Sequence, residues 1–354
     1  MFMYYINENI KDLYRVKFHE ERGGALRLDM NENPEGLPKE IFDKTISKLS
    51  SEYIAKYPEK DRLMKMLAYH NNIAYENISV TAGSDEAMRL IFQCFGEQGK
   101  KLLTVMPTFE MYDVYANMFG MRHEIVDYQK DYTINATQIL DAIDQETGLI
   151  ILVNPNSPIG YTYNEKDVRA VVERGKSVGA IVVIDEAYHY FYDSTFMPLI
   201  KEYDNLLILR TFSKLFSMAG LRIGYVSGET KLIEYIEKAE STFNVNIVAI
   251  LFAMEVINDQ KLITRLIQKE KEGRIWITEK LNEADYKTVS MEGNYVLFLP
   301  NRDSQIVVKE LKKKNVWVRD YTRGILKGWI RISTGSKECM EKFWQVFVEV
   351  DRVR

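Results

Sequence analysis

The sequence has few residues of the kinds that build disulfide scaffolds and metal sites. Its 354 residues include only two cysteines, Cys94 and Cys339, and four histidines. Neither cysteine has a CxxC neighbour, and the histidines show no HxxxH or HExxH spacing. These absences argue against a disulfide-stapled domain and against a metal site. We therefore expect two buried free thiols and no metal.

Long apolar runs and an excess of basic residues are also missing. The longest apolar run, NIVAILFAM at 246–254, is far shorter than the roughly 18 residues of a membrane-spanning helix. The start, MFMYYINENIKDLY, has no basic segment ahead of an apolar one. A formal net charge of −4 provides no broad basic surface for nucleic acid. We expect a soluble, cytoplasmic protein that binds neither membranes nor nucleic acid.

The chain does contain a regular alternation of apolar strands and amphipathic helices. Between about residues 78 and 228, segments of helical periodicity separate the runs ISVTAG, KLLTVMP, LIILVNPN, AIVVIDEAY, LLILRTFSK and RIGYVSG. Continuous apolar strands linked by helices predict an α/β fold whose mainly parallel sheet is covered on both faces. Polar or glycine-rich clusters follow these runs, so we expect them to meet at the carboxyl edge of the sheet and form a ligand site there.

The pattern changes near residue 230. Long charged amphipathic helices follow, and then the strand candidates YVLFLP, VWVRDY and WIRIST around a helix, IVVKELKKK. This order is typical of an α+β arrangement. We predict a large α/β domain over residues 31–250, and a smaller α+β domain formed by residues 251–354 together with an N-terminal arm over residues 1–30.

The stretch RTFSKLFSMAGLRIGY at 210–225 surrounds one lysine with groups that bind anions. Most lysines lie on the surface. Lys214, however, stands beside the hydroxyls of Thr211 and Ser213, and the cation Arg222 and two glycines follow it. An anion pocket next to an amine suits a lysine that forms a Schiff base with an aldehyde.

Further candidates stand at other strand ends. Asp185 ends AIVVIDEAY; it either caps a helix or keeps a bound pyridine nitrogen protonated, and Tyr188 is placed to hydrogen-bond a ring hydroxyl. Ser84 and Asp85 open an apolar helix, so they cap it or direct its N–H groups and dipole at a phosphate. Phe109, in MPTFEMY, either packs in the core or stacks on a flat ring.

The motifs SDE, PTF, NPNSPIG, DEAY, TFSK and GLRIGY stand in the order and approximate spacing of the fold-type I pyridoxal phosphate enzymes. Over nearly its whole length the chain most resembles the histidinol-phosphate aminotransferase family. The resemblance implies that pyridoxal 5'-phosphate is the cofactor, that Lys214 carries it as a Schiff base and shuttles protons, and that Asp185 pairs with its ring nitrogen. It also implies that Tyr188 meets the ring oxygen and Phe109 stacks on the ring. The implied phosphate ligands are Ser84, Asp85, Thr211, Ser213 and Arg222.

Two motifs match the family less closely. In the dimers of this family a tyrosine of an RYP-like motif reaches the phosphate across the interface. The matching motif here is KYPEK, so Tyr57 is the candidate and we expect a homodimer. The family usually has NPNNPTG where this chain has NPNSPIG. Ser157 thus replaces the asparagine that touches the ring oxygen; the shorter serine makes that contact weakly or through water, or Asn156 takes it over.

The resemblance also suggests where the substrate binds. Arg331 lies in an apolar run, WIRIS, where an unpaired charge is costly until a partner arrives, and it resembles the family arginine that binds the substrate carboxylate or phosphate. Arg319 resembles a second anion-binding arginine of the phosphate-using members. Tyr14 falls at the matching distance before Asn31, within a segment that covers the active site. Tyr14 is therefore a candidate lid residue, and Asn31 is a further substrate-binding candidate.

Three functions are compatible with these motifs. The resemblance implies an aminotransferase that moves an amino group between an amino acid such as glutamate and a small phosphorylated ketone or amine. A decarboxylase of O-phosphoserine or O-phosphothreonine is an alternative within the same fold, because substrate orientation selects the bond that breaks. A non-catalytic α/β binding protein is a third, although FGEQGKK at 95–101 lacks the P-loop spacing and no strand is followed by GxGxxG.

Overall fold

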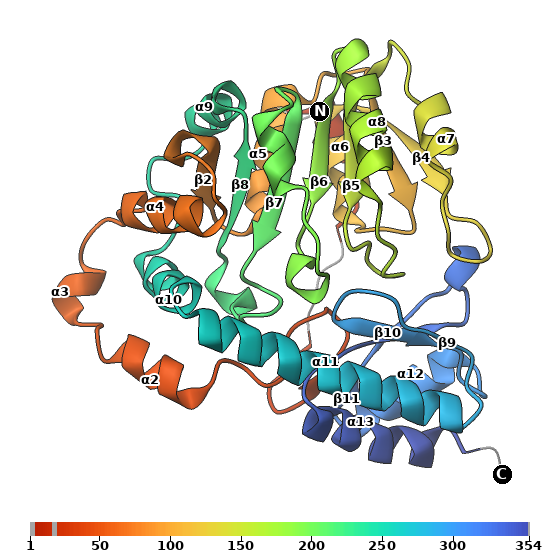
Figure 1. Cartoon of the computed structure of the whole chain (residues 1–354). Helices are drawn as coiled ribbons and strands as arrows, with labels where there is room; N and C mark the ends of the chain where they lie inside the picture. Colours follow the sequence, from red (N-terminus) through yellow and green to blue (C-terminus); the bar gives the residue numbers. More distant parts are fainter. Residues whose placement is uncertain (1–3, 16–19, 353–354) are drawn as a thin grey trace.

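Residues 4–15 and 20–352 are described by the computed structural model, and they form a large sheet wrapped in helices with a smaller sheet beside it (Figure 1). The large sheet has seven strands in the order β2-β8-β7-β6-β5-β3-β4. Its strands are β2 (Ile78–Thr81), β3 (Lys101–Met106), β4 (Arg122–Asp127), β5 (Thr147–Val153), β6 (Ile181–Asp185), β7 (Leu206–Thr211) and β8 (Gly224–Gly228). The predicted α/β fold with a mainly parallel sheet is confirmed.

Helices bury both faces of this sheet. On β5, Ile150 and Leu152 join a cluster with α8, whereas Leu149, Ile151 and Val153 join another with α5 and α6. Successive strand residues point to opposite faces, so burial on both sides requires the continuous apolar runs seen in the sequence. The helices around the sheet are α4 (Asp61–His70), α5 (Ser84–Phe95), α6 (Met111–Phe119), α7 (Ala136–Asp141), α8 (Glu165–Ser177), α9 (Thr230–Ala239) and α10 (Ile247–Ile257).

Strand β8 runs antiparallel to both of its neighbours, β2 and β7, whereas the other neighbouring strands pair in parallel. Its amino end therefore lies at the edge where β7 and β6 have their carboxyl ends. Strand β4 was not predicted from the sequence. It lies at an edge of the sheet, and RHEIVD is largely polar and partly exposed, so it lacks the apolar run by which the interior strands were found.

The smaller sheet follows the long helix α11 (Gln260–Glu283). It has the order β12-β13-β10-β9, and its four strands pair antiparallel. The elements of this part are β9 (Thr288–Val289), β10 (Tyr295–Phe298), α12 (Ser304–Lys313), β11 (Val316–Trp317), β12 (Arg319–Asp320), β13 (Ile330–Ser333) and α13 (Lys337–Val350). Helix α11 contributes Leu266 to the main cluster and Ile277 to the cluster of the small part. The exact domain bounds of 31–250 and 251–354 stay a prediction.

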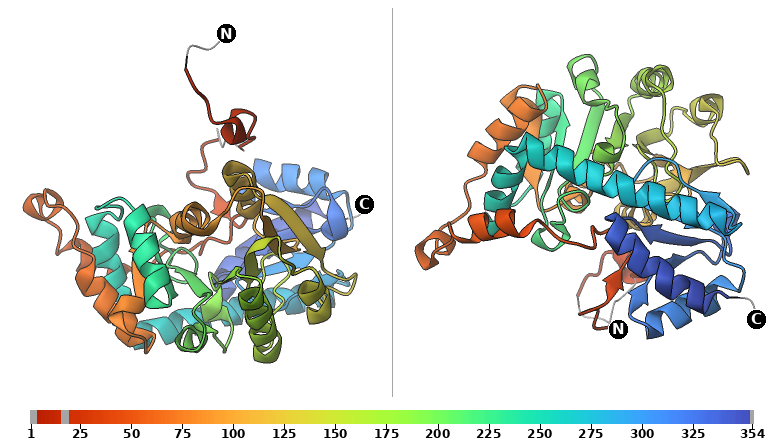
Figure 2. Two further views of the ribbon diagram at one scale, coloured as in Figure 1. Left: turned by 90° about the horizontal axis from the view of Figure 1, so that it is seen from above. Right: turned by 60° about the horizontal axis from the view of Figure 1, so that its bottom comes forward.

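The N-terminal segment connects the two parts. Strand β1 (Leu26–Arg27) pairs in parallel with β11 of the small part. The same segment contains the short helices α1 (Glu8–Lys11), α2 (Lys39–Ile46) and α3 (Ser51–Ile54) (Figures 1 and 2). The left view of Figure 2 shows the red segment ahead of α1 leading away from the body of the molecule. Single 3-10 turns occur at η1 (Tyr75–Asn77), η2 (His189–Phe191), η3 (Met197–Lys201), η4 (Ala219–Leu221) and η5 (Gly324–Leu326).

Two predictions from the sequence's sparse features can be compared with this structure. None of the helices in residues 4–15 and 20–352 combines the length and the hydropathy that a membrane span needs. Both cysteines are free: Cys339 is buried, but Cys94 is partly exposed. The expectation of a buried thiol is therefore wrong for Cys94, on α5, whose thiol donates to the backbone carbonyl of Tyr235 on α9 at 3.4 Å.

Candidate active site

Lys214 lies just past β7, at the edge where the parallel strands end. Its Nζ donates a hydrogen bond to the backbone carbonyl of Met30 at 3.1 Å and lies 5.4 Å from the centroid of the Tyr188 ring. Met30 is 184 residues away in sequence, so the N-terminal segment passes directly over the lysine. This places an amine, an aromatic ring and a strand end at one position.

Asp185 ends β6 and is almost completely buried. Its Oδ2 accepts a hydrogen bond from the Tyr112 hydroxyl at 2.7 Å, and its Oδ1 accepts one from the backbone N–H of Ala187 at 3.0 Å. Burial raises the pKa of this carboxyl, while the two hydrogen bonds and the charge of Lys214 oppose the shift. Tyr112 was not among the residues predicted from the sequence, because a tyrosine in an apolar helix is ordinarily a core residue.

Tyr188, Asn31 and Ser157 meet beside Lys214. The Asn31 side-chain amide donates to the Tyr188 hydroxyl at 2.8 Å and to the Ser157 hydroxyl at 3.2 Å. Burial would raise the pKa of Tyr188, but the positive charges of Lys214 and Arg331 outweigh it, so this pKa lies below its ordinary value. Asn31 adopts a left-handed φ of 53° and keeps its Oδ1 buried without a partner. Such backbone strain and an unpaired acceptor are common at binding sites.

Asn156 has a different set of contacts. Its side chain approaches the Pro107 carbonyl and the Ile159 N–H, both at 3.4 Å, and its backbone carbonyl accepts from the Tyr295 hydroxyl. Asn156 therefore bonds within its own loop and to neighbouring segments. Ser157, in contrast, accepts from the same Asn31 amide that donates to Tyr188. The serine hydroxyl therefore lies near Tyr188, the residue predicted to contact the ring oxygen.

An anion cradle forms between β8 and the start of α5. A Cβ atom on Gly224 would lie 2.6 Å from the Ser84 backbone nitrogen, and one on Gly83 would lie 2.8 Å from Arg222 Nη2. Only glycine at both positions allows these groups to approach so closely. Arg222 is exposed and adopts a left-handed φ of 52°. It thus faces the N-terminus of α5, where free N–H groups and the helix dipole favour an anion.

The remaining cofactor candidates lie around this cradle. Thr211 donates to the Ser213 hydroxyl at 2.9 Å, so the two hydroxyls stand together after β7. Asp85 accepts a hydrogen bond from Tyr115 at 2.9 Å. Phe109 is 45% exposed and makes an edge contact with Tyr112, with ring centroids 5.8 Å apart. Phe109 therefore packs against the tyrosine whose hydroxyl donates to Asp185.

Arg331 stands at the opposite side of the site, on β13. Its Nη2 donates to the Asp29 carbonyl at 2.6 Å and its Nη1 to the Tyr321 hydroxyl at 3.2 Å. Among the described residues Arg331 has no acidic partner, and its buried Nε has no hydrogen bond at all. Arg319, by comparison, forms an ion pair with Glu110 at 2.9 Å, and both side chains are largely exposed.

Two predicted residues are not brought to this site within the single chain. Tyr57 is 75% exposed and stacks on Phe243, with ring centroids 4.3 Å apart. Tyr14 is 80% exposed. In the described part of the chain neither side chain hydrogen-bonds to the residues around Lys214.

A buried ion pair supports the strand ends from behind. Glu186 follows Asp185, and Arg210 precedes Thr211, so alternation places this pair on the opposite face of β6 and β7. Arg210 donates to Glu186 through Nε at 2.9 Å and Nη2 at 2.8 Å, and both side chains are at most 4% exposed. The pair therefore links the two strands that carry Asp185 and Lys214.

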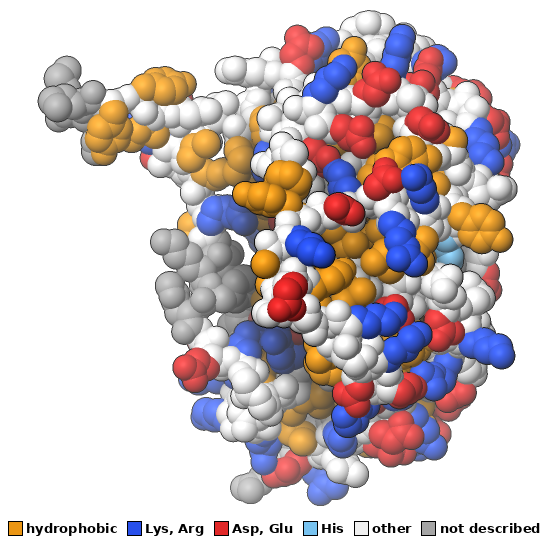
Figure 3. Space-filling view, turned by 90° about the vertical axis from the view of Figure 1, so that its left-hand side faces the viewer, with side chains coloured by type: hydrophobic (Ala, Val, Ile, Leu, Met, Phe, Trp, Pro, Cys, Tyr) orange, Lys and Arg blue, Asp and Glu red, His pale blue; other side chains and the backbone are white. Residues whose placement is uncertain are grey.

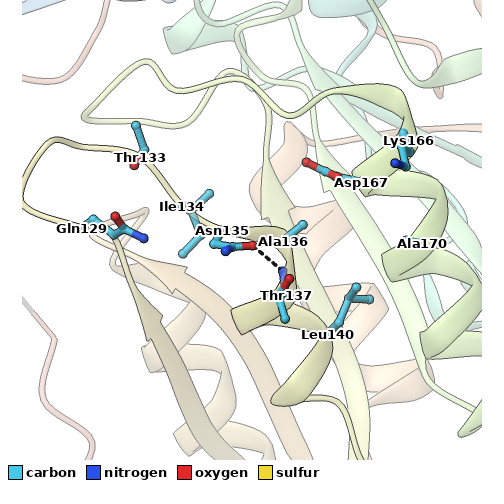
Figure 4. Close-up of a pocket in the computed structure, with 10 residues that line it drawn as sticks. All are labelled: Gln129, Thr133, Ile134, Asn135, Ala136, Thr137, Leu140, Lys166, Asp167 and Ala170. Atoms are coloured by element: carbon cyan, nitrogen blue, oxygen red, sulfur yellow. Dashed lines mark hydrogen bonds between the residues drawn. The ribbon is translucent and has the colours of Figure 1, made fainter.

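A surface pocket lies elsewhere, between the loop after β4, α7 and α8 (Figure 4). The Asn135 side chain there caps α7 by accepting from the Thr137 N–H at 2.9 Å. None of the candidate site residues lines this pocket. Its polar groups cap helices, and the pocket is not part of the site around Lys214.

A seven-stranded sheet of this order, with its lysine after β7 and its buried aspartate at the end of β6, defines the class of fold-type I pyridoxal phosphate enzymes. The fold is similar to that of the histidinol-phosphate aminotransferase from Sinorhizobium meliloti, solved in complex with pyridoxal-5'-phosphate, with a TM-score of 0.84 at 23% identity over 93% of this chain and 91% of that one. The corresponding enzyme from Clostridium acetobutylicum gives a TM-score of 0.82 at 24% identity, over 92% and 99% of the two chains.

Residues 24–347 match the family described as aminotransferase class I and II. The histidinol-phosphate aminotransferase of Clostridium novyi is 33% identical over 334 residues, 93% of each chain. That of Methanocaldococcus jannaschii is 32% identical over 356 residues, 97% of this chain and 92% of the other. The chain belongs to the aminotransferase class I and II family. It is a transaminase that uses pyridoxal 5'-phosphate, so the prediction of an enzyme is confirmed and the non-catalytic alternative is set aside.

Proposed function

We propose that this enzyme moves an amino group between an amino acid, glutamate in the first instance, and a small phosphorylated ketone or amine. The name of its relatives, histidinol-phosphate aminotransferase, contains such a phosphorylated amine. The observation that carries the proposal is Arg331. Its buried Nε has no hydrogen-bond partner, and no acidic residue pairs with its guanidinium among the described residues. A buried charge of this kind is costly unless an anion binds to it. A substrate carboxylate or phosphate supplies two oxygens in the geometry that the guanidinium fork accepts.

The residues around Lys214 fit the cofactor. Bound pyridoxal phosphate supplies an aldehyde for a lysine amine and a ring that withdraws electrons from the substrate Cα. We assign Lys214 to hold the cofactor and to move the proton at Cα. Asp185 holds a proton on the ring nitrogen, and Phe109 covers one face of the ring. Tyr188 donates to the ring oxygen, in a position that the amide of Asn31 helps to set.

The cradle between β8 and α5 would hold the cofactor phosphate. The glycines at 83 and 224 leave the Ser84 N–H and the Arg222 guanidinium close together, as a dianion requires. We assign Ser84, Asp85, Thr211, Ser213 and Arg222 to this role. Ser157 is our candidate for the second contact to the ring oxygen, because it shares the Asn31 amide with Tyr188, whereas the polar groups of Asn156 bond to other segments.

A second copy of the chain would complete the site. Figure 3 shows a face with apolar side chains gathered among charged ones. The exposed apolar residues of α2, α3 and the segments beside them are Phe42, Ile46, Ile54, Tyr57 and Phe243. Of these, Tyr57 and Phe243 stack on each other, and exposed apolar surface is typical of a subunit interface. We propose a homodimer in which Tyr57 reaches across the interface and binds the cofactor phosphate in the site of the partner subunit. The cytoplasmic location stays a prediction.

The reaction can be tested with purified enzyme loaded with pyridoxal phosphate. Glutamate should convert the bound cofactor to its amine form, as read from loss of the visible absorbance band, and a phosphorylated ketone should restore it. Lys214→Ala should lose the band, whereas Lys231→Ala, an exposed lysine on α9, should keep it. Release of CO2 from O-phosphoserine or O-phosphothreonine without amino transfer would instead favour the decarboxylase.

The roles of Arg319, Arg331 and Tyr14 are tested by substrate competition. Phosphorylated acceptors should compete with inorganic phosphate at the substrate site, and Arg319→Gln or Tyr14→Phe should weaken only the phosphorylated acceptor. Equal turnover of acceptors with and without phosphate would contradict the phosphorylated substrate. For the dimer, sedimentation should give twice the chain mass. Tyr57→Phe should weaken cofactor binding while Tyr69→Phe, at another highly exposed position, should not.

A further inference from the structure

Tyr112 occupies an unusual position behind the cofactor site. It lies in the first turn of α6 and has no exposed surface. Its hydroxyl donates to Oδ2 of Asp185 at 2.7 Å, while Oδ1 of Asp185 is held by the Ala187 N–H. Each oxygen of the carboxylate therefore has one donor from the protein, and the remaining lone pairs are left for a ligand.

The tyrosine acts as a donor toward Asp185 at this position. Burial, together with the charge of Asp185, raises the pKa of Tyr112 well above its ordinary value, so the phenol stays protonated. Packing fixes the ring, because Tyr112 belongs to the buried cluster formed with α5 and with β5, and it contacts the edge of Phe109. One residue thus touches both the carboxylate and the ring proposed to stack on the cofactor.

The hydrogen bond has a chemical consequence for Asp185. A carboxylate that keeps a ring nitrogen protonated must itself be ionised, yet burial favours its neutral form. A hydroxyl that donates a hydrogen bond to the carboxylate stabilises its ionised form, and the bond from Tyr112 lowers the pKa of Asp185 accordingly. We propose that Tyr112 is a positioning residue that keeps Asp185 ionised and turned toward the ring nitrogen of the cofactor. This inference rests on the role proposed above for Asp185.

The test uses cofactor binding to the apoenzyme and the pH titration of the bound cofactor's absorbance. Tyr112→Phe removes one oxygen and leaves the packed ring in place. Since a hydrogen bond to a charged group is involved, we expect the dissociation constant for pyridoxal phosphate to rise about tenfold and the titration to shift. The matched control is Tyr128→Phe, which removes a buried hydroxyl whose one hydrogen-bond partner among the described residues is another tyrosine, Tyr163, at 3.3 Å. It should change neither reading.

A second pair of variants separates the two levels of the proposal. Asp185→Asn should weaken cofactor binding, and adding Tyr112→Phe to it should have no further effect. If Asp185→Asn leaves binding and spectrum unchanged, the proposed role of Asp185 fails. If Asp185→Asn acts but Tyr112→Phe matches the Tyr128 control, or acts equally in the Asp185→Asn background, the role of Asp185 stands and the inference about Tyr112 is overturned. Binding is measured on the folded fraction isolated by gel filtration.

Discussion

Replacing Glu186 by glutamine should destabilise the enzyme strongly, because it leaves the charge of Arg210 unpaired inside the protein. Glu186 has no exposed side-chain surface and accepts hydrogen bonds from Arg210, from the Thr195 hydroxyl and from the Phe196 N–H. All of these partners are donors. A glutamine keeps the volume of the side chain but turns its own NH2 group toward at least one of them and removes the negative charge.

The size of the effect follows from this burial. Breaking a buried ion pair by neutralising one partner costs about 3–5 kcal/mol of unfolding free energy. The pair between Arg122 and Glu146 is the matched control: its atoms are 2.8 Å apart, as in the buried pair, but its side chains are 57% and 61% exposed. Glu146→Gln should therefore cost much less unfolding free energy than Glu186→Gln, because exposed ion pairs contribute little.

Urea denaturation of both variants and the wild type, at one fixed concentration of pyridoxal phosphate, measures the difference. The buried pair also bridges the strands that end in Asp185 and Thr211, so Glu186→Gln should weaken cofactor binding as well. The reasoning is refuted if Glu186→Gln costs no more unfolding free energy than Glu146→Gln.

Three further outcomes are expected. Burial raises the pKa of Glu270 to about 7, from 4.5 in the unfolded chain. Between pH 4.5 and about 7 the folded state therefore binds more protons than the unfolded state. The unfolding free energy of the wild type, measured relative to that of Glu270→Gln, should fall by roughly 3 kcal/mol as the pH rises through this range. The same difference between the urea denaturation curves of the two proteins at both ends of the range would contradict this prediction. Gly224→Ala should cost about 1–3 kcal/mol and weaken cofactor binding, because the new Cβ meets the Ser84 nitrogen at 2.6 Å. Gly220→Ala, which has open space, is its control in denaturation and cofactor titration. Arg331→Lys should raise the KM for the amino acid about tenfold or more with a smaller change in kcat, because lysine cannot bind two oxygens side by side; an unchanged KM in steady-state assays would remove Arg331 from the substrate site.

The sequence alone predicted six of the seven strands of the large sheet and the edge at which the candidate site residues lie. The six apolar runs became β2, β3, β5, β6, β7 and β8, because strands buried on both faces must be apolar at every position. The residues after these runs could be assigned to one edge because parallel strands end there together. Lys214 and Asp185 were found in this way, since Asp185 ends β6 and Lys214 lies in the loop just past β7.

Other features depended on how distant segments pack. The sequence does not show that β8 is antiparallel, so the tertiary structure alone explains how Arg222, ahead of its strand, reaches the same edge. Nor does the local sequence pattern show that the carbonyl of Met30 accepts a hydrogen bond from Lys214, or that Tyr112 donates one to Asp185, which is 73 residues away. A tyrosine on an apolar helix face is predicted to be a core residue whether or not its hydroxyl donates to a carboxylate. Local periodicity determines which face of a helix or strand is buried, whereas the partner that each buried polar group meets is decided only when the elements pack together.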